Sequence, residues 1–221
     1  MTKLQRVALL LPWTFLSASL FGAGDLSQYR QFQLDSDLPG LVRQAGMDPA
    51  EAKVIHQRPA KIQEFSWRGE PADSVKGILF TFYNGALFRM AVDYDRYNTE
   101  GLTAQDMIAA LSSTYGAAVD PLTEITARSV YGGEESVKVL ARWEDAKWSF
   151  NLVRFKYEPS FTLLAFSKQL QAEAQAAIDE AVRLDRIEAP QRAIERRNNE
   201  DAEKRLLQEK ARQTNRPDFR P

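Results

Sequence analysis

The chain has 221 residues, no cysteine, a single histidine and a formal net charge of −1 at pH 7. Without cysteine it has no disulfide framework, no thiolate metal ligands and no cysteine nucleophile. Because the charge is close to balance, no overall field favours nucleic acid, and we expect no nucleic-acid partner.

Residues 1–24 have the pattern of a secretory signal peptide. Lys3 and Arg6 precede an uncharged, largely apolar run that ends in the small residues Gly22-Ala23-Gly24. An uncleaved membrane anchor is the competing interpretation, but polar residues dilute the run. We expect an exported protein, periplasmic or extracellular, with no stable membrane span if the leader is cleaved.

Two short helical segments are expected next. Asp35, Ser36 or Asp37 can cap a helix that ends at Gly46, because these side chains accept hydrogen bonds from free backbone N–H groups. The segment from Pro49 to Gln57 is predicted to add another helical turn or two, closed by Pro59.

The clearest signal is a β-hairpin around Asn84-Gly85, since this dipeptide between two β-rich runs is typical of a tight turn. A two-residue loop would place Phe80 opposite Arg89. A three-residue loop with a bulge at Gly85 would instead pair Phe82 with Ala86, so we favour the bulged form. That register puts six apolar side chains on one surface: Ile78, Phe80, Phe82, Phe88, Met90 and Val92.

A second helix is predicted from the N-cap Thr103 to Gly116, followed by strands within residues 136–143, 147–157 and 160–167. From Gln169 the chain is rich in Ala, Glu and Arg, which predicts a helix with a narrow apolar stripe. Beyond Pro190 we expect a solvated helix.

The predicted fold class is therefore α+β, with antiparallel sheet and short helices on one face, followed by a long C-terminal helix. The two halves share the order helix, glycine, strands, which indicates either a duplicated αβββ unit or a chance alternation. The predicted organisation is a leader (1–24), a first unit (25–100), a second unit (101–168) and a charged helix with tail (169–221).

No catalytic constellation is recognised. His56 has no second histidine or any cysteine with which to share a metal, and no G-x-S-x-G motif supplies a nucleophile. We assign no catalytic, metal or cofactor residue and interpret His56 as structural. Arg58 is expected to pair with a carboxylate, either a partner's or, preferably, one of Asp35 to Asp37. His56, Arg58 and Trp67 are the candidate interaction residues.

The segments YRQFQL, LPGLVRQAG, VIHQRPAKIQEFSW and LFTFYNGALFRMAVDYDRYNTEGLTAQDMIAAL, within residues 29–116, resemble a family of uncharacterised exported bacterial proteins. That resemblance implies no activity. The order of elements is also similar to the αβββ modules of outer-membrane assembly lipoproteins and of tandem-repeat enzyme inhibitors. This chain departs from the lipoproteins because it has no cysteine to carry a lipid.

From these features we expect a non-catalytic periplasmic module that binds a protein or peptide through a sheet face, a sheet edge or the C-terminal helix. The alternative is an envelope hydrolase that uses carboxylates and His56.

Overall fold

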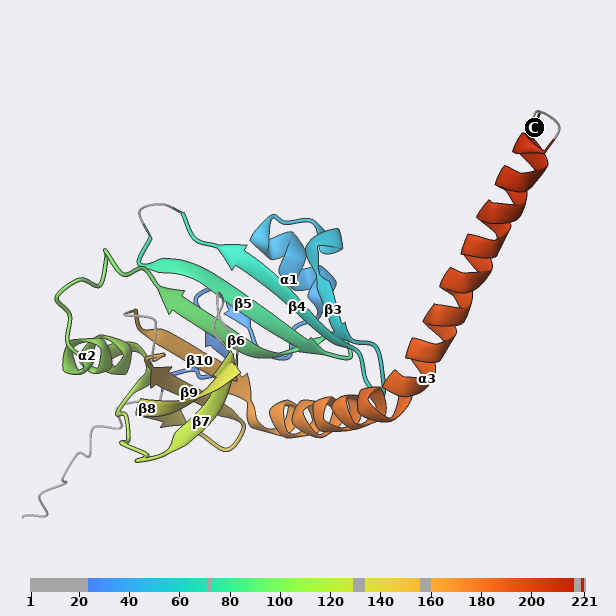
Figure 1. Cartoon of the computed structure of the whole chain (residues 1–221). Helices are drawn as coiled ribbons and strands as arrows, with labels where there is room; N and C mark the ends of the chain where they lie inside the picture. The colour runs from blue at the N-terminus through green and yellow to red at the C-terminus, as the bar shows by residue number, and fades with distance from the viewer. Residues whose placement is uncertain (1–23, 71–72, 129–133, 156–159, 217–219, 221) are drawn as a thin grey trace, which may run out of the picture.

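The structure, a computed structural model, describes residues 24–70, 73–128, 134–155, 160–216 and 220. The predicted leader lies outside the described residues apart from Gly24. Within these residues, three α-helices and a 3-10 turn accompany eight longer strands and two short ones. Figure 1 shows how they are arranged. The elements are β1 (Gln28–Tyr29), β2 (Phe32–Gln33), α1 (Leu38–Ala45), η1 (Pro49–Glu51), β3 (Lys53–His56), β4 (Ile62–Arg68), β5 (Val75–Tyr83), β6 (Ala86–Tyr94), α2 (Ala104–Tyr115), β7 (Glu124–Arg128), β8 (Glu134–Glu144), β9 (Trp148–Val153), β10 (Thr162–Ser167) and α3 (Lys168–Asn215).

The eight longer strands form one antiparallel sheet in the order β3-β4-β5-β6-β10-β9-β8-β7. This order is symmetric about the β6–β10 pair. In each half of the chain the last strand lies at the centre of the sheet and the first strand at its edge. Each half contributes a helix and four strands, one strand more than the αβββ unit expected from the sequence. The α+β class with its long C-terminal helix is confirmed, whereas duplication itself stays a prediction.

One face of the sheet, called the core face here, carries the main hydrophobic core. A continuous row of paired residues crosses five strands, and all of its members are almost fully buried: Phe80, Met90, Ala165, Phe150 and Trp143. The helices α1 and α2 and the β1–β2 hairpin pack against this row. The short helices therefore cover one face, as the sequence predicted.

Capping residues in the sequence predicted the two short helices correctly. The Asp37 side chain accepts a hydrogen bond from the Gly40 backbone N–H, and Gly46 ends α1 in the left-handed conformation. Thr103 and Asp106 form a reciprocal capping box at the start of α2. The Trp143 indole donates to the Gly116 carbonyl over 3.0 Å, which holds the end of α2 against the core face.

The helical turns predicted through Gln57 are wrong beyond Glu51. Only Pro49–Glu51 is helical, and Lys53–His56 forms strand β3 at one edge of the sheet. β-branched Val54 and Ile55 suit an extended chain, and pairing with β4 outweighs the weak helical tendency of this short segment.

The hairpin is confirmed, but the predicted three-residue loop is wrong. Asn84 and Gly85 both have positive φ and form a two-residue loop in which Tyr83 pairs with Ala86. The bulge lies further along, at Phe88, so that Thr81 rather than Phe80 faces Arg89. Phe88 consequently leaves the expected apolar surface and joins a cluster on the opposite face.

An ion pair fastens the N-terminal segment to the turn before β5. Arg30 donates two hydrogen bonds to Asp73, at 2.5 and 2.7 Å. Hydrogen bonding from Arg30 lowers the pKa of the Asp73 carboxyl to about 2, and the same contact raises the pKa of Arg30. The pKa of Asp73 is lower in the folded state than in the unfolded chain. The pair therefore stabilises the fold at pH values above the ordinary pKa of the carboxyl, and this stabilisation is lost as the pH falls towards 2.

We expect the Asp73→Asn variant to lose about 1 kcal/mol of unfolding free energy at pH 7, a value reduced for solvent screening because both side chains are partly exposed. Urea unfolding at pH 7 and at pH 2 should show this difference shrinking in acid. Asp201→Asn, in an exposed stretch of α3, is the control. A difference that persists unchanged at pH 2 would contradict the assignment.

Candidate functional site

The face of the sheet opposite the core, called the outer face here, is crossed by the first part of α3. The helix follows β10 directly, and its N-cap is Ser167, whose hydroxyl accepts a hydrogen bond from the Leu170 N–H. Ala174 is fully buried against Ile62 and Phe88, and three partly buried side chains complete this contact: Tyr83, Leu170 and Ile178. The alanine keeps the helix backbone close to the strands, so α3 forms a wall on the outer face.

Two neighbouring cavities lie beside this wall and share Arg89 and Gln175. The first has a volume of about 350 Å³ and is lined by Ile55, His56, Ile62, Glu64, Leu79, Thr81, Phe88, Arg89, Ala91, Gln175 and Ile178. The second, of about 420 Å³, is lined by Arg89, Ile125, Thr126, Ala127, Leu164, Phe166, Gln171 and Gln175. Together they are called the outer-face cavities, and each has the size of a small-ligand or side-chain site.

A bulge in the edge strand directs His56 into the first cavity. The pairing of β3 with β4 shifts between Val54 and His56, which leaves Ile55 as the additional residue. Two successive side chains, Ile55 and His56, consequently line the same cavity, where regular alternation would have placed them on opposite faces.

The bulge in β6 has the same effect on Arg89. Phe88 is the additional residue between the pairs Phe82–Leu87 and Thr81–Arg89, and both Phe88 and Arg89 line the first cavity. The two bulges therefore bring an aromatic ring, a guanidinium and an imidazole together. Neither bulge could be placed from alternation in the sequence.

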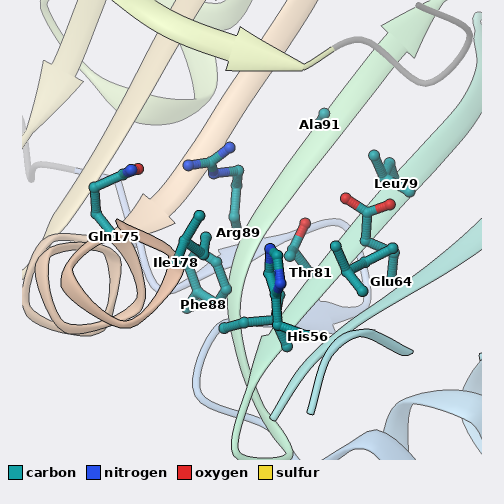
Figure 2. A pocket seen from close by; sticks show the side chains of 11 residues that line it. His56, Glu64, Leu79, Thr81, Phe88, Arg89, Ala91, Gln175 and Ile178 are labelled. Carbon is teal, nitrogen blue, oxygen red and sulfur yellow. The ribbon is translucent and has the colours of Figure 1, made fainter. Parts of the chain in front are cut away.

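Arg89 is held in position between the two cavities. Its Nε donates to the Gln171 Oε1 over 2.9 Å, and its guanidinium carbon lies 5.6 Å from the centre of the Phe88 ring. Figure 2 shows Arg89 between Gln175 of α3 and the strand residues His56 and Glu64. A planar cation fixed in this way is suited to binding a carboxylate or a carbonyl oxygen.

The first cavity combines polar groups with an apolar floor. His56 is half-buried at the strand edge, Glu64 comes from β4, and Thr81 is 7% exposed. Leu79 and Ala91 also line the cavity and lie to one side of these groups (Figure 2). The arrangement can accept an apolar group and offer hydrogen bonds to its polar ends.

The three interaction candidates from the sequence do not form one site. His56 lines the first cavity. Arg58 pairs with Glu188 of α3, so the expected pairing with Asp35 to Asp37 is wrong. A carboxylate 130 residues away could not be identified from local sequence.

Trp67 lies on the core face, half-buried, with its ring centre 5.8 Å from that of Phe32 in an edge-to-face arrangement. Arg89 is the functional candidate that sequence reasoning missed. The sequence signal for Arg89 was a charged residue inside a mostly apolar strand.

Among the residues that the structure describes, no cluster of three or more histidine, aspartate or glutamate side chains could hold a metal ion. Within the same part of the chain, no helix combines the length and apolar character needed to cross a membrane. In comparisons with known proteins, the chain matches no family model, no curated protein and no solved structure.

We expect Ala174→Asp to detach the first part of α3 from the sheet, because it would bury a carboxylate among apolar side chains at a cost of about 3 kcal/mol. Hydrogen exchange of residues 168–182 should accelerate by about 100-fold if this segment opens independently. Ala172→Asp, at an exposed position of the same helix, is the matched control. Unchanged protection in Ala174→Asp would show that the contact does not hold the helix.

Proposed function

We propose that the chain is a non-catalytic protein- or peptide-binding module of the bacterial envelope, and that the outer-face cavities receive a segment of its partner. The observation that carries this proposal is the pair of cavities along α3, which join an apolar floor to hydrogen-bonding groups on both sides of Arg89. The leader pattern of residues 1–24 supports export.

The edge strand β3 adds to the case for a peptide. It lies at the end of the sheet and exposes Val54 and Ile55, which are 48% and 37% accessible. Edge strands present backbone donors and acceptors to an extended segment. Since Ile55 also lines the first cavity, a segment lying in that cavity can contact both the strand and the cavity floor.

The lining of the cavities favours binding over hydrolysis. Among the described residues that line them, the hydroxyl groups are those of Thr81 and Thr126, and there is no serine. Thr81 is nearly buried within β5, a poor position for a nucleophile that must reach a substrate.

We expect Gln175→Trp to weaken binding of peptides selected on the purified chain from a random peptide library by at least about tenfold. Gln175 is exposed and borders both cavities, so the indole would fill them without removing a buried side chain. Ala176→Trp, the next exposed residue of α3, is the control, with affinity measured by fluorescence anisotropy. Failure to select any peptide, or equal affinity for both variants, would count against the proposal.

The hydrolase alternative is favoured by one observation, the presence of His56 and Glu64 in the same cavity. If the chain were a hydrolase acting through these groups, His56→Ala and Glu64→Gln would each remove an activity found by screening ester and peptide substrates. We expect no such activity in the purified chain. A turnover abolished by both substitutions but retained in Lys53→Ala would establish the alternative.

A further inference from the structure

The second cavity borders three successive residues of β7, namely Ile125, Thr126 and Ala127. Successive side chains of a strand point to opposite faces, so three residues in a row line one cavity only where the edge of the strand faces it. Ala127 is almost fully buried and Ile125 packs against the same apolar cluster, whereas Thr126 is exposed. The cavity therefore meets the backbone of β7 as well as its side chains.

The pairing of β7 with β8 shows which backbone groups reach this edge. The Val139 N–H donates to the Thr123 carbonyl over 3.0 Å, and the register continues through β7 without a shift. In an antiparallel pair, residues that exchange hydrogen bonds alternate with residues whose N–H and C=O point away from the partner strand. Counting from Thr123, Ile125 bonds to β8, and Thr126 directs both of its backbone groups to the other side.

This other side, called the free edge of β7 here, ends the sheet. Among the residues that the structure describes, β8 is the one strand that pairs with β7. The backbone donor and acceptor of Thr126 can therefore pair with an extended segment that enters the second cavity.

We propose that an extended segment of the partner adds a strand to the free edge of β7 at Thr126 and places an apolar side chain in the second cavity. This inference rests on the proposed function and specifies how the partner segment is held.

The walls of the second cavity favour an apolar side chain. A strand that pairs with β7 shares its two faces, so every second side chain lies on the same side as Ala127. On that side Ala127 belongs to one apolar cluster with Leu164, and Phe166 lines the same cavity. The pairing takes its donors and acceptors from the backbone, so it does not draw on the charge of Arg89, whose Nε already donates to Gln171.

The opposite wall of the cavity favours a single strand over a second copy of the chain. Gln171 and Gln175 of α3 line the same space of about 420 Å³ as β7. Paired strands lie about 4.8 Å apart, so one extended segment fits beside β7. A second copy that paired through its own β7 would bring its β8 against α3.

The edge strand at the other end of the sheet is less suited to pairing. The register of β3 shifts between Val54 and His56, and a bulge breaks the regular spacing of the backbone groups along an edge. All five residues of β7 pair with β8 without such a shift. We therefore assign the added strand to β7.

The test removes one backbone donor. Thr126→Pro deletes the N–H at the free edge, and proline is tolerated where the N–H points away from the ladder. We expect this variant to bind the tightest peptide of the library selection at least about tenfold more weakly by fluorescence anisotropy. Thr126→Val keeps the N–H and removes only the hydroxyl, so this matched control should keep its affinity. Thermal unfolding of both variants checks that the fold is retained.

N-methylation of the same peptide gives a second readout with the unmodified chain. In an added strand every second N–H points to β7, so N-methylation at alternate positions should weaken binding by at least about tenfold. N-methylation at the positions between them should have much less effect. A peptide held by its side chains alone would not show this period of two.

The outcomes distinguish the two proposals. Equal tolerance of N-methylation at all positions, with binding still weakened by Gln175→Trp, would overturn the added strand and leave peptide binding intact. A folded Thr126→Pro variant with unchanged affinity would exclude the edge of β7. Failure to select any peptide would overturn both proposals.

Two further measurements complete the test. Sedimentation that reveals a dimer of the purified chain, abolished in Thr126→Pro, would replace the peptide by a second copy. If Thr126→Pro fails to fold, hydrogen exchange of the Thr126 amide in the unmodified chain decides instead. We expect exchange to slow by at least about tenfold when the peptide is bound, and unchanged exchange would exclude β7.

Discussion

The antiparallel pairing of β6 with β10 is the contact on which the rest of the structure depends. These are the last strands of the two halves of the chain, and their pairing converts two four-stranded sheets into one. On the core face it sets Met90 beside Ala165 and Val92 beside Leu163, and all four side chains are fully buried. On the outer face the same register places Arg89 beside Phe166. The pairing that closes the core therefore also brings the walls of the second cavity together.

The parts of the fold that the sequence predicted correctly are those set by neighbouring residues. Asp37, Thr103 and Gly46 act through backbone groups within a few positions, so their effect can be recognised without the tertiary structure. The turn at Asn84-Gly85 is of the same kind, since both residues tolerate positive φ. The strand β3 was missed because its four residues become extended only by pairing with β4.

The candidate site was harder to predict because two bulges create it. If side chains alternated strictly along β6, Phe88 and Arg89 would lie on opposite faces of the sheet. With a two-residue loop, Arg89 would then lie on the core face. The structure keeps the two-residue loop and inserts an additional residue at Phe88 instead, which turns Arg89 to the outer face. Arg89, which made the two-residue loop look unfavourable in the sequence, therefore lies between the two cavities. The ion pair between Arg58 and Glu188 was also beyond sequence-based prediction, because no local pattern relates the two segments that it joins.

The helix α3 passes through two environments, and its sequence changes accordingly. Before Pro190 it buries Ala174 and Ala181, and Glu188 reaches back to Arg58 through a partly exposed ion pair worth at most about 1 kcal/mol. After it, the described residues are exposed, and Leu206 is 72% accessible. The helix bends along its length and then leaves the body (Figure 1), as expected for a helix with an internal proline.

The part of α3 after Pro190 extends a helix that the docked part before Pro190 has already formed. It therefore does not need its own unfavourable nucleation step. Pairs one turn apart then support it, including Arg196 with Glu200 and Arg212 with Glu209. Since the docked part is also the wall of both cavities, the contacts that shape the outer-face cavities also hold the base of the projecting helix. A partner segment that contacts Gln175 would strengthen the same attachment, because binding to the docked arrangement stabilises it over the detached one.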